Sequence, residues 1–270
     1  MKNAYALILS IRVRDFAMIR KAIVLAAGKG TRLMPLTLAM PKEMIRVGVK
    51  PVIEHVIEVL KAGGIKEILI IVGRNKEAIM NYLGSGERLG VELYYRIQEK
   101  PEGSAIATYL GKEFVGSEDF VLAYGDTYFK PYDAIRNVLR VHSECEACIT
   151  LLLDSVDDPS RYGLVKVDQE GRVLGIVEKP SVEEAKLYRS DGGYLSIGGL
   201  LVLKPEIFDA IIKTKKGKNG EVWLTDSVEY LRNCGRRVYG CEFHGSRYDI
   251  GTFESLREAD RMEHKENNKS

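Results

Sequence analysis

A continuous apolar run that passes directly into a glycine-rich turn constrains the fold of this 270-residue chain more than any other feature. The run is KAIVLA at residues 21–26, and Gly28 and Gly30 follow it. Such a run is typical of a strand that is buried on both faces of a parallel sheet. Glycines placed after this strand let the backbone approach a ligand, and their free N–H groups can bind phosphate oxygens.

The rest of the pattern predicts an α/β fold in two parts. Strands and helices alternate over the first half of the chain, which favours a Rossmann-like, mostly parallel sheet with helices on both faces. Here we expect strands at 67–72, 91–98 and 120–124 and helices at 51–62, 75–83, 103–114 and 131–142. The second half predicts a smaller, β-rich part: strands at 148–154, 164–168, 173–178, 196–203 and 237–243, and helices at 205–213, 224–234 and from 252. Glu170-Gly171 indicates a hairpin between two of these strands.

We expect one domain over residues 21–260. Residues 1–20 are expected to be an N-terminal extension. We expect residues 1–17 to be dispensable, or to result from a wrongly assigned start codon, because a second methionine, Met18, lies just before the first strand. The alternative is an extra strand or helix that covers the core. Residues 261–270 are polar, and we expect them to form a frayed tail.

Composition excludes several classes of protein. Lysine plus arginine number 40 and aspartate plus glutamate 38, so the net charge of +2 argues against a dedicated nucleic-acid binder. Apolar runs are too short for a membrane span. Four cysteines, Cys145, Cys148, Cys234 and Cys241, suggest small packing residues rather than a zinc site or disulfides. With no address signal, we expect a cytoplasmic protein.

The glycine turn matches neither of two common nucleotide-binding patterns. A Walker A loop is absent, and Leu33 stands where the dinucleotide fingerprint has its third glycine. However, two cations follow the turn closely, Arg32 and Lys42. Cations on such a loop suit a triphosphate, whose charge must be neutralised as it shifts during a reaction.

The segments LAAGKGTRLMPLT and PKEMIRVGVKPVIEHVIE resemble the sugar-1-phosphate nucleotidyltransferases, also called NDP-sugar pyrophosphorylases. Within this family, the motifs resemble most those of the glucose-1-phosphate uridylyl- and thymidylyltransferases, and the resemblance extends from Lys21 to about Leu256. It implies a fold of the nucleotide-diphospho-sugar transferase type. The resemblance implies that Arg32 grips the β- and γ-phosphates and that Lys42 binds the α-phosphate. The loop residues that it assigns to nucleotide binding are Ala27, Gly28, Gly30 and Thr31.

The resemblance also implies that Gln98 reads the base, with Gly103 near it. A carboxamide presents both a donor and an acceptor, which complement the imide edge of a pyrimidine. Guanine has a similar edge, so Gln98 does not fix the base, although UTP or dTTP is preferred.

Two carboxylates are expected to bind Mg²⁺. Asp126 follows the strand at 120–124, and carboxyl ends of parallel strands are where such sheets bind ligands. Asp249 lies in a segment that matches the family pattern W-x-D-T-G, but isoleucine replaces the threonine and the tryptophan lies outside the match.

The sugar 1-phosphate is expected to meet residues from three segments. Glu178 and Lys179 resemble the family's E-K-P motif, in which the glutamate binds sugar hydroxyls and the lysine holds the sugar phosphate. Gly163 resembles the glycine of a Y-G segment that touches the sugar, and Glu221 belongs to a G-E-x-x-x-T-D stretch that lines the pocket. At residues 196–199 many relatives would carry an asparagine that this chain lacks, so the sugar stays open.

Together these residues predict an enzyme of the EC 2.7.7 type. An oxygen of a sugar 1-phosphate, preferably glucose 1-phosphate, attacks the α-phosphorus of the NTP, and pyrophosphate leaves in line. Arg32, Lys42 and Lys179 are the expected catalytic residues. The substrates are the expected partners, without nucleic acid or membrane, in a chain that could form a homo-oligomer.

Three alternatives remain open. The first is a guanylyl- or cytidylyltransferase acting on mannose 1-phosphate or another sugar phosphate. The second is a non-catalytic, nucleotide-sensing subunit of the same fold, which would be free to lose the charged residues named above. The third is a glycosyltransferase that uses a nucleotide sugar, but this class typically has a D-x-D metal motif that the context of Asp126 does not supply.

Overall fold

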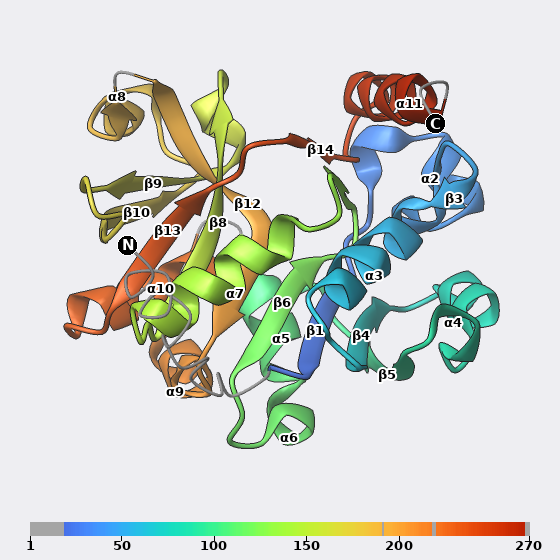
Figure 1. The fold of residues 1–270 in the computed structure, drawn as a ribbon, viewed down its shortest axis with the longest axis horizontal. Helices are drawn as coiled ribbons and strands as arrows, with labels where there is room; N and C mark the ends of the chain where they lie inside the picture. Colours follow the sequence, from blue (N-terminus) through green and yellow to red (C-terminus); the bar gives the residue numbers. More distant parts are fainter. Residues whose placement is uncertain (1–18, 191, 218–219, 268–270) are drawn as a thin grey trace, which may run out of the picture.

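Four parallel strands form the centre of the structure, a computed structural model that describes residues 19–190, 192–217 and 220–267 (Figure 1). Their order across the sheet is β6-β1-β4-β5, so the first strand lies between two later ones. Strands β1, β4 and β6 carry the apolar runs of a strand that is covered on both faces, whereas β5, at the edge of the sheet, mixes buried and exposed residues. The bounds are β1 (Lys21–Ala26), β4 (Glu67–Gly73), β5 (Glu92–Gln98) and β6 (Phe120–Tyr124).

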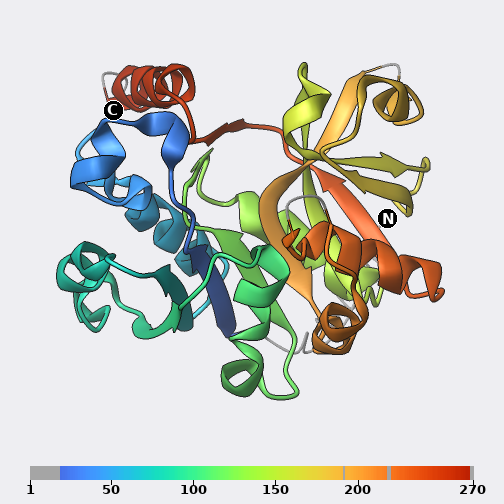
Figure 2. The same ribbon diagram turned by 180° about the vertical axis from the view of Figure 1, so that it is seen from behind.

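Helices cover both faces of this sheet, as predicted. Figure 1 shows α3 (Val52–Ala62) and α7 (Ala134–Glu144) in front of it, and Figure 2 shows α5 (Ser104–Tyr109), α9 (Glu206–Lys213) and α10 (Leu224–Asn233) on the opposite face. Side chains of β1 alternate between two cores: Ala22 and Val24 pack with α3 and α7, and Ile23 packs with the other helices. The alternation follows from the period of two in a strand.

A smaller β-rich part continues the same sheet. Strand β12 (Gly193–Leu203) runs antiparallel to β6, and also pairs with β8 (Ile149–Val156) and β9 (Gly163–Val167). Its register shifts between Ile197 and Leu201, where Gly199 has φ of 85°. This irregularity lets one strand serve both parts, since a bulge bends a strand and increases its twist. The other members are β10 (Val173–Glu178), β11 (Arg189–Ser190) and β13 (Val238–Glu242).

The predicted hairpin between β9 and β10 is confirmed, since the two strands pair antiparallel. The structure also contains short ribbons that the pattern did not predict, β2 with β3 and β7 with β14. The remaining elements are β2 (Arg46–Val47), β3 (Lys50–Pro51), β7 (Thr127–Lys130), β14 (Ser246–Asp249), α2 (Leu36–Ala39), α4 (Glu77–Leu83), α6 (Lys112–Val115), α8 (Val182–Lys186), α11 (Phe253–Asn267) and the 3₁₀ helices η1 (Thr31–Leu33), η2 (Lys42–Met44), η3 (Glu87–Leu89) and η4 (Pro159–Arg161).

Two predicted helices differ from the structure. The single helix expected over 103–114 is divided into α5 and α6 at Gly111, where a Cβ atom would lie 2.2 Å from Ile23 Cδ1. The chain therefore passes too close to the sheet there for a larger residue. The helix expected from residue 75 begins at Glu77, because Asn75 has φ of 59° and does not cap it.

The frayed tail expected at residues 261–270 is also wrong over most of its length. Helix α11 continues to Asn267, and its Glu263 is buried, where it accepts a hydrogen bond from the Tyr128 hydroxyl at 2.5 Å. The predictions for residues 1–17 concern a segment outside the described residues. Within residues 19–190, 192–217 and 220–267, no helix is both long and apolar enough to cross a membrane.

The cysteine and histidine side chains differ in burial: His55 and His142 are buried, whereas Cys234 and His264 are exposed. All four cysteines are free thiols, and Cys148 and Cys241 are buried. Buried His55 makes two hydrogen bonds, to the Tyr132 hydroxyl at 2.7 Å and to the Val47 carbonyl at 2.9 Å.

Candidate active site

One cavity of about 530 Å³ opens at the carboxyl ends of β1, β5 and β6 and extends toward the β-rich part. Its size is within the usual range for a small-molecule site. Every site residue that the sequence predicted lies in its lining. They are Ala27, Gly28, Gly30, Thr31, Arg32, Lys42, Gln98, Gly103, Asp126, Gly163, Glu178, Lys179, Glu221 and Asp249.

The side chain of Lys42 packs against the backbone of the glycine turn. A Cβ atom on Gly28 would lie 3.2 Å from both Cε and Nζ of Lys42, and one on Gly30 would lie 2.9 Å from Thr37 Cγ2. Gly30 also has φ of 65°, in the left-handed region that favours glycine. Glycine is therefore required at this turn both for backbone conformation and for space beside the lysine.

Lys42 forms an ion pair with Asp126 at the floor of the cavity. Burial alone would lower the pKa of Lys42, but the negative charges of Asp126 and Glu43 outweigh it and hold the pKa above its ordinary value. The ammonium group is thus charged at neutral pH and ready to meet a phosphate.

Asp249 reaches the same place from a distant part of the chain. Strand β14 pairs with β7, and the Ile250 N–H donates to the Asp126 carbonyl at 2.8 Å. Burial and the neighbouring Asp126 raise the pKa of Asp249, while Lys42 and Arg32 act in the opposite direction. Arg32 Nη2 lies 3.9 Å from Asp249 Oδ2.

These two carboxylates fit a divalent cation. Both line the cavity, and the charge of Asp126 raises the cost of ionising Asp249 unless positive charge is added. Among the residues that the structure describes, no cluster of three or more His, Cys, Asp or Glu side chains could hold a metal. Two carboxylates suffice for Mg²⁺, however, because it is usually bound by one or two of them together with substrate phosphates and water.

The residues expected at the base lie at the end of β5. Gln98 is buried, and its Nε2 donates to the Gly103 carbonyl at 3.3 Å, so its Oε1 is left for a ligand. Gly103 has φ of 106°, and a Cβ atom there would lie 2.3 Å from the Val222 carbonyl oxygen. The close contact joins this loop to the loop that carries Glu221.

The residues expected at the sugar meet at the hairpin. Thr225 Oγ1 donates to Glu178 Oε2 at 2.6 Å, and a Cβ atom on Gly163 would lie 2.9 Å from the same oxygen. Burial raises the pKa of Glu178, although the bond from Thr225 opposes the shift. Lys179 has φ of 41°, and its Nζ lies 3.7 Å from the centroid of the Trp223 ring.

Sequence reasoning missed several parts of the site. Lys76 is buried under the glycine turn, where its Nζ donates to Glu43 at 2.8 Å and to the Ala26 carbonyl at 2.5 Å. Nothing in the sequence around residue 76 indicates this role. Arg247 and Tyr124 also line the cavity. For Arg247 a signal existed, because it precedes Asp249 by two residues on a strand and so shares its face.

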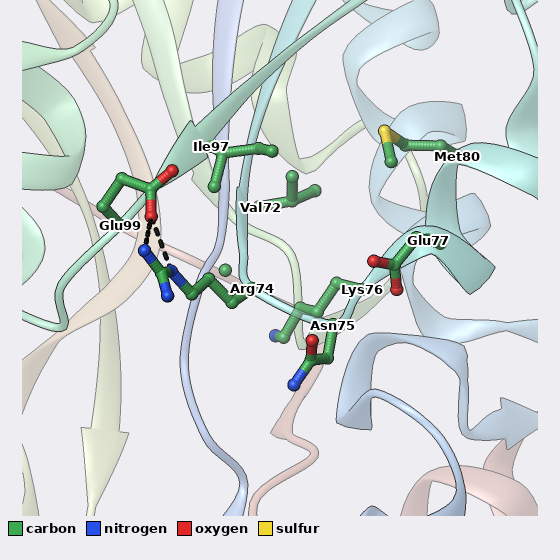
Figure 3. A pocket seen from close by; sticks show the side chains of 9 residues that line it. Val72, Arg74, Asn75, Lys76, Glu77, Met80, Ile97 and Glu99 are labelled. Atoms are coloured by element: carbon green, nitrogen blue, oxygen red, sulfur yellow. Dashed lines mark hydrogen bonds and ion pairs between the residues drawn. The ribbon is translucent and has the colours of Figure 1, made fainter.

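A second, smaller pocket of about 230 Å³ lies beyond the glycine turn, at the ends of β4 and β5 (Figure 3). Figure 3 shows Arg74 paired with Glu99 across it, and both side chains are exposed. None of the predicted catalytic residues lines this pocket.

A parallel sheet that brings a glycine turn, cations and paired carboxylates to one edge defines a nucleotide-binding α/β transferase. Comparison with known proteins identifies the family. The nucleotidyl transferase family matches residues 21–266. This chain therefore belongs to that family and is an enzyme of the sugar-1-phosphate nucleotidyltransferase type.

Relatives and solved structures agree. The UTP–glucose-1-phosphate uridylyltransferase of Mycoplasma pneumoniae is 34% identical over 87% of this chain and 88% of its own length. The glucose-1-phosphate thymidylyltransferase of Streptomyces griseus is 30% identical over 90% of this chain, which spans 65% of that protein. A crystal structure of UDP-glucose pyrophosphorylase complexed with UDP-glucose is 28% identical, with a TM-score of 0.81 over 92% of this chain and all of that one.

Proposed function

We propose that this chain joins UTP to glucose 1-phosphate, giving UDP-glucose and pyrophosphate with the help of Mg²⁺. The observation that carries the proposal is the single cavity in which Lys42 and Asp126 lie between the glycine turn and the sugar-side residues Glu178 and Lys179. Two phosphorylated molecules held there would meet at Lys42. The full-length uridylyltransferase relative and the UDP-glucose complex favour UTP and glucose.

The reaction needs no covalent protein intermediate, because positioning and charge stabilisation suffice for phosphoryl chemistry of this kind. The N–H groups of the glycine turn and Arg32 bind the β- and γ-phosphates. Lys42 neutralises charge at the α-phosphate as the bond to pyrophosphate breaks, and Lys179 holds the attacking phosphate. Mg²⁺, held by Asp126 and Asp249, would supply further positive charge to the phosphate oxygens of both substrates.

Lys179 has to move for this role. Its ammonium group lies over the Trp223 ring and 3.9 Å from Glu178 Oε1. These contacts are weak, so a phosphate bound in the cavity can replace them with little loss of free energy. A cation–π contact at a partly exposed site is worth only about 0.5–1 kcal/mol, which a charged hydrogen bond to phosphate outweighs.

The thymidylyltransferase relative supports a second candidate, dTTP in place of UTP. The two nucleotides share the imide edge that Gln98 would read and differ by a 2′-hydroxyl and a methyl group. Gln98 therefore accepts both, and discrimination has to come from other contacts.

A panel of UTP, dTTP, GTP and CTP with glucose, mannose and galactose 1-phosphate tests the proposal. Pyrophosphate release gives the rate, and mass spectrometry identifies the nucleotide sugar. We expect UTP with glucose 1-phosphate to give the highest kcat/KM. Dominant turnover of GTP or CTP would contradict the base assignment, and nucleotide binding without turnover of any pair would favour the nucleotide-sensing alternative.

A further inference from the structure

One arginine that no motif assigned lies inside the active-site cavity. Arg247 is on β14, two residues before Asp249, so both side chains extend from the same face of the strand toward the cavity. Its side chain is only 5% exposed. A cation buried so deeply beside substrate-binding residues requires a physical explanation, since burial of a charge is costly unless it is paired.

Contacts on three sides fix the position of this guanidinium. Its Nε donates to Asp154 Oδ2 on β8 at 2.6 Å. Its central carbon lies 5.5 Å from the centroid of the Tyr162 ring, in a cation–π contact. A Cβ atom on Gly198 would lie 3.3 Å from Arg247 Cδ, so the glycine in the bend of β12 leaves room for the arginine.

The pairing with Asp154 uses only part of the guanidinium. Arginine has five N–H donors, and four of them are on the two Nη atoms. Within the described part of the chain, the Nε bond to Asp154 is the one hydrogen bond that the Arg247 side chain makes. The remaining donors form a rigid fork that complements a phosphate.

The neighbours of Arg247 indicate which phosphate it meets. Asp249 lies on one side of it along β14, and Tyr162 leads directly into Gly163, where Glu178 and Thr225 meet. The arginine thus lies between the metal-binding carboxylates and the sugar-side residues. An attacking sugar phosphate has to occupy this same region, whereas the β- and γ-phosphates belong at the glycine turn.

We infer that Arg247 is a second phosphate-binding cation for the sugar 1-phosphate, and that Asp154 is the positioning residue that orients it. This inference rests on the proposed function. The Lys179 ammonium group lies over the Trp223 ring and its side chain is half exposed, whereas the Arg247 side chain is buried and paired with Asp154. A preorganised donor of this kind costs no reorganisation on binding, so it contributes more to catalysis than a flexible one.

Steady-state kinetics of Arg247→Met and Arg247→Lys, with each substrate varied in turn, test the inference. We expect Arg247→Met to lower kcat/KM for glucose 1-phosphate about 10- to 100-fold, because charged hydrogen bonds are lost. KM for UTP should stay within about twofold. Arg247→Lys keeps the charge but loses the fork, so it should recover only part of the loss. Guanidinium ions added to Arg247→Met should restore some activity.

The positioning role has its own variant. Asp154→Asn leaves the arginine in place but weakens its anchor, and we expect a rise in KM for glucose 1-phosphate with a smaller effect on kcat. Arg140→Met is the matched control, since Arg140 lies exposed on α7 and pairs with Glu144 one turn away. The control should match the wild-type chain in every parameter.

The outcomes separate this inference from the proposed function. An inactive wild-type chain would contradict the function itself. An active wild type with unchanged kcat/KM for the sugar phosphate in Arg247→Lys and Arg247→Met would overturn the inference, as would a rise in KM for UTP equal to the rise in KM for the sugar phosphate. Binding of UTP, measured by calorimetry, checks that each variant is folded; where Arg247→Met fails this check, the sugar-phosphate KM of Arg247→Lys decides.

Discussion

Single side chains determine the chemistry at Lys42. Its ammonium group lies against the glycine turn on one side and Asp126 on the other, and it is raised in pKa by the surrounding carboxylates. We therefore expect the loss of Lys42 to lower the rate of the chemical step strongly.

We predict that Lys42→Met lowers turnover of UTP and glucose 1-phosphate by about 100- to 1,000-fold, as for other preorganised groups that stabilise a transition state. Pyrophosphate release measures the rate. Lys61→Met is the control, because Lys61 is on the solvent side of α3 and pairs only loosely with Glu58, at 3.9 Å. Turnover of Lys42→Met within a few-fold of wild type would contradict the role.

At this scale the sequence predicted most of the site, and the reason is local. Arg32 and the glycines lie on one turn, and Glu178 and Lys179 are neighbours, so short segments display their pattern. Arg247 and Lys76 were missed because their roles depend on long-range contacts with Asp154 and Glu43. The roles of the predicted residues stay predictions until ligands or variants are examined.

At the scale of elements, β1 and its turn are supported from below by an ion pair between η2 and the β4–α4 connection. Glu43 and Lys76 are both buried, and Lys76 also binds the carbonyl of Ala26 at the end of β1. Burial raises the pKa of Glu43, although Lys76 and Lys42 oppose the shift. The pair is therefore costly to break from either side.

We predict that Lys76→Met lowers the free energy of unfolding by about 3–5 kcal/mol, since it leaves a buried carboxylate without its partner. Urea unfolding measures the change. The double variant Lys76→Met with Glu43→Gln should recover part of the loss, because the unpaired charge is removed. A double variant less stable than the single one would show that the ion pair is not the source of the effect.

Helix α3 carries a buried histidine, His55. Its Nε2 donates to the Val47 carbonyl, and its Nδ1 lies 2.7 Å from the Tyr132 hydroxyl, which can donate to a neutral ring or accept from a protonated one. Burial lowers the pKa of His55, although the contact with Val47 opposes the shift. As pH falls below about 6.5, the unfolded chain takes up a proton first. Stability due to this histidine is present above that pH and is lost on acidification.

We predict that the free energy of unfolding falls between pH 7 and pH 5.5 with a contribution of up to about 1.4 kcal/mol per pH unit from His55. His55→Gln cannot titrate, so its stability should change less over the same range. Unfolding in urea at a series of pH values gives both slopes. Parallel slopes for the wild type and the variant would rule out His55 as the titrating group.

The whole molecule shows which parts of the fold are encoded locally. Alternating strands and helices along the first half predicted the parallel sheet, because β1, β4 and β6 are buried on both faces and each carries its own apolar signal. The pairing of β14 with β7 was not predicted, since both strands are short and lie far apart in the sequence. The split of α5 from α6 depends on Gly111 touching the sheet, a tertiary contact that helical periodicity does not report.

In the proposed reaction, one cavity holds a nucleotide and a sugar phosphate so that they meet at Lys42. A crystal structure of the chain with Mg²⁺ and UDP-glucose would show whether they do. We expect the diphosphate beside Lys42, with Mg²⁺ on Asp126 and Asp249, the uracil at Gln98 and the sugar at Glu178. A nucleotide sugar bound elsewhere, with the glycine turn and Lys42 free of ligand, would contradict it.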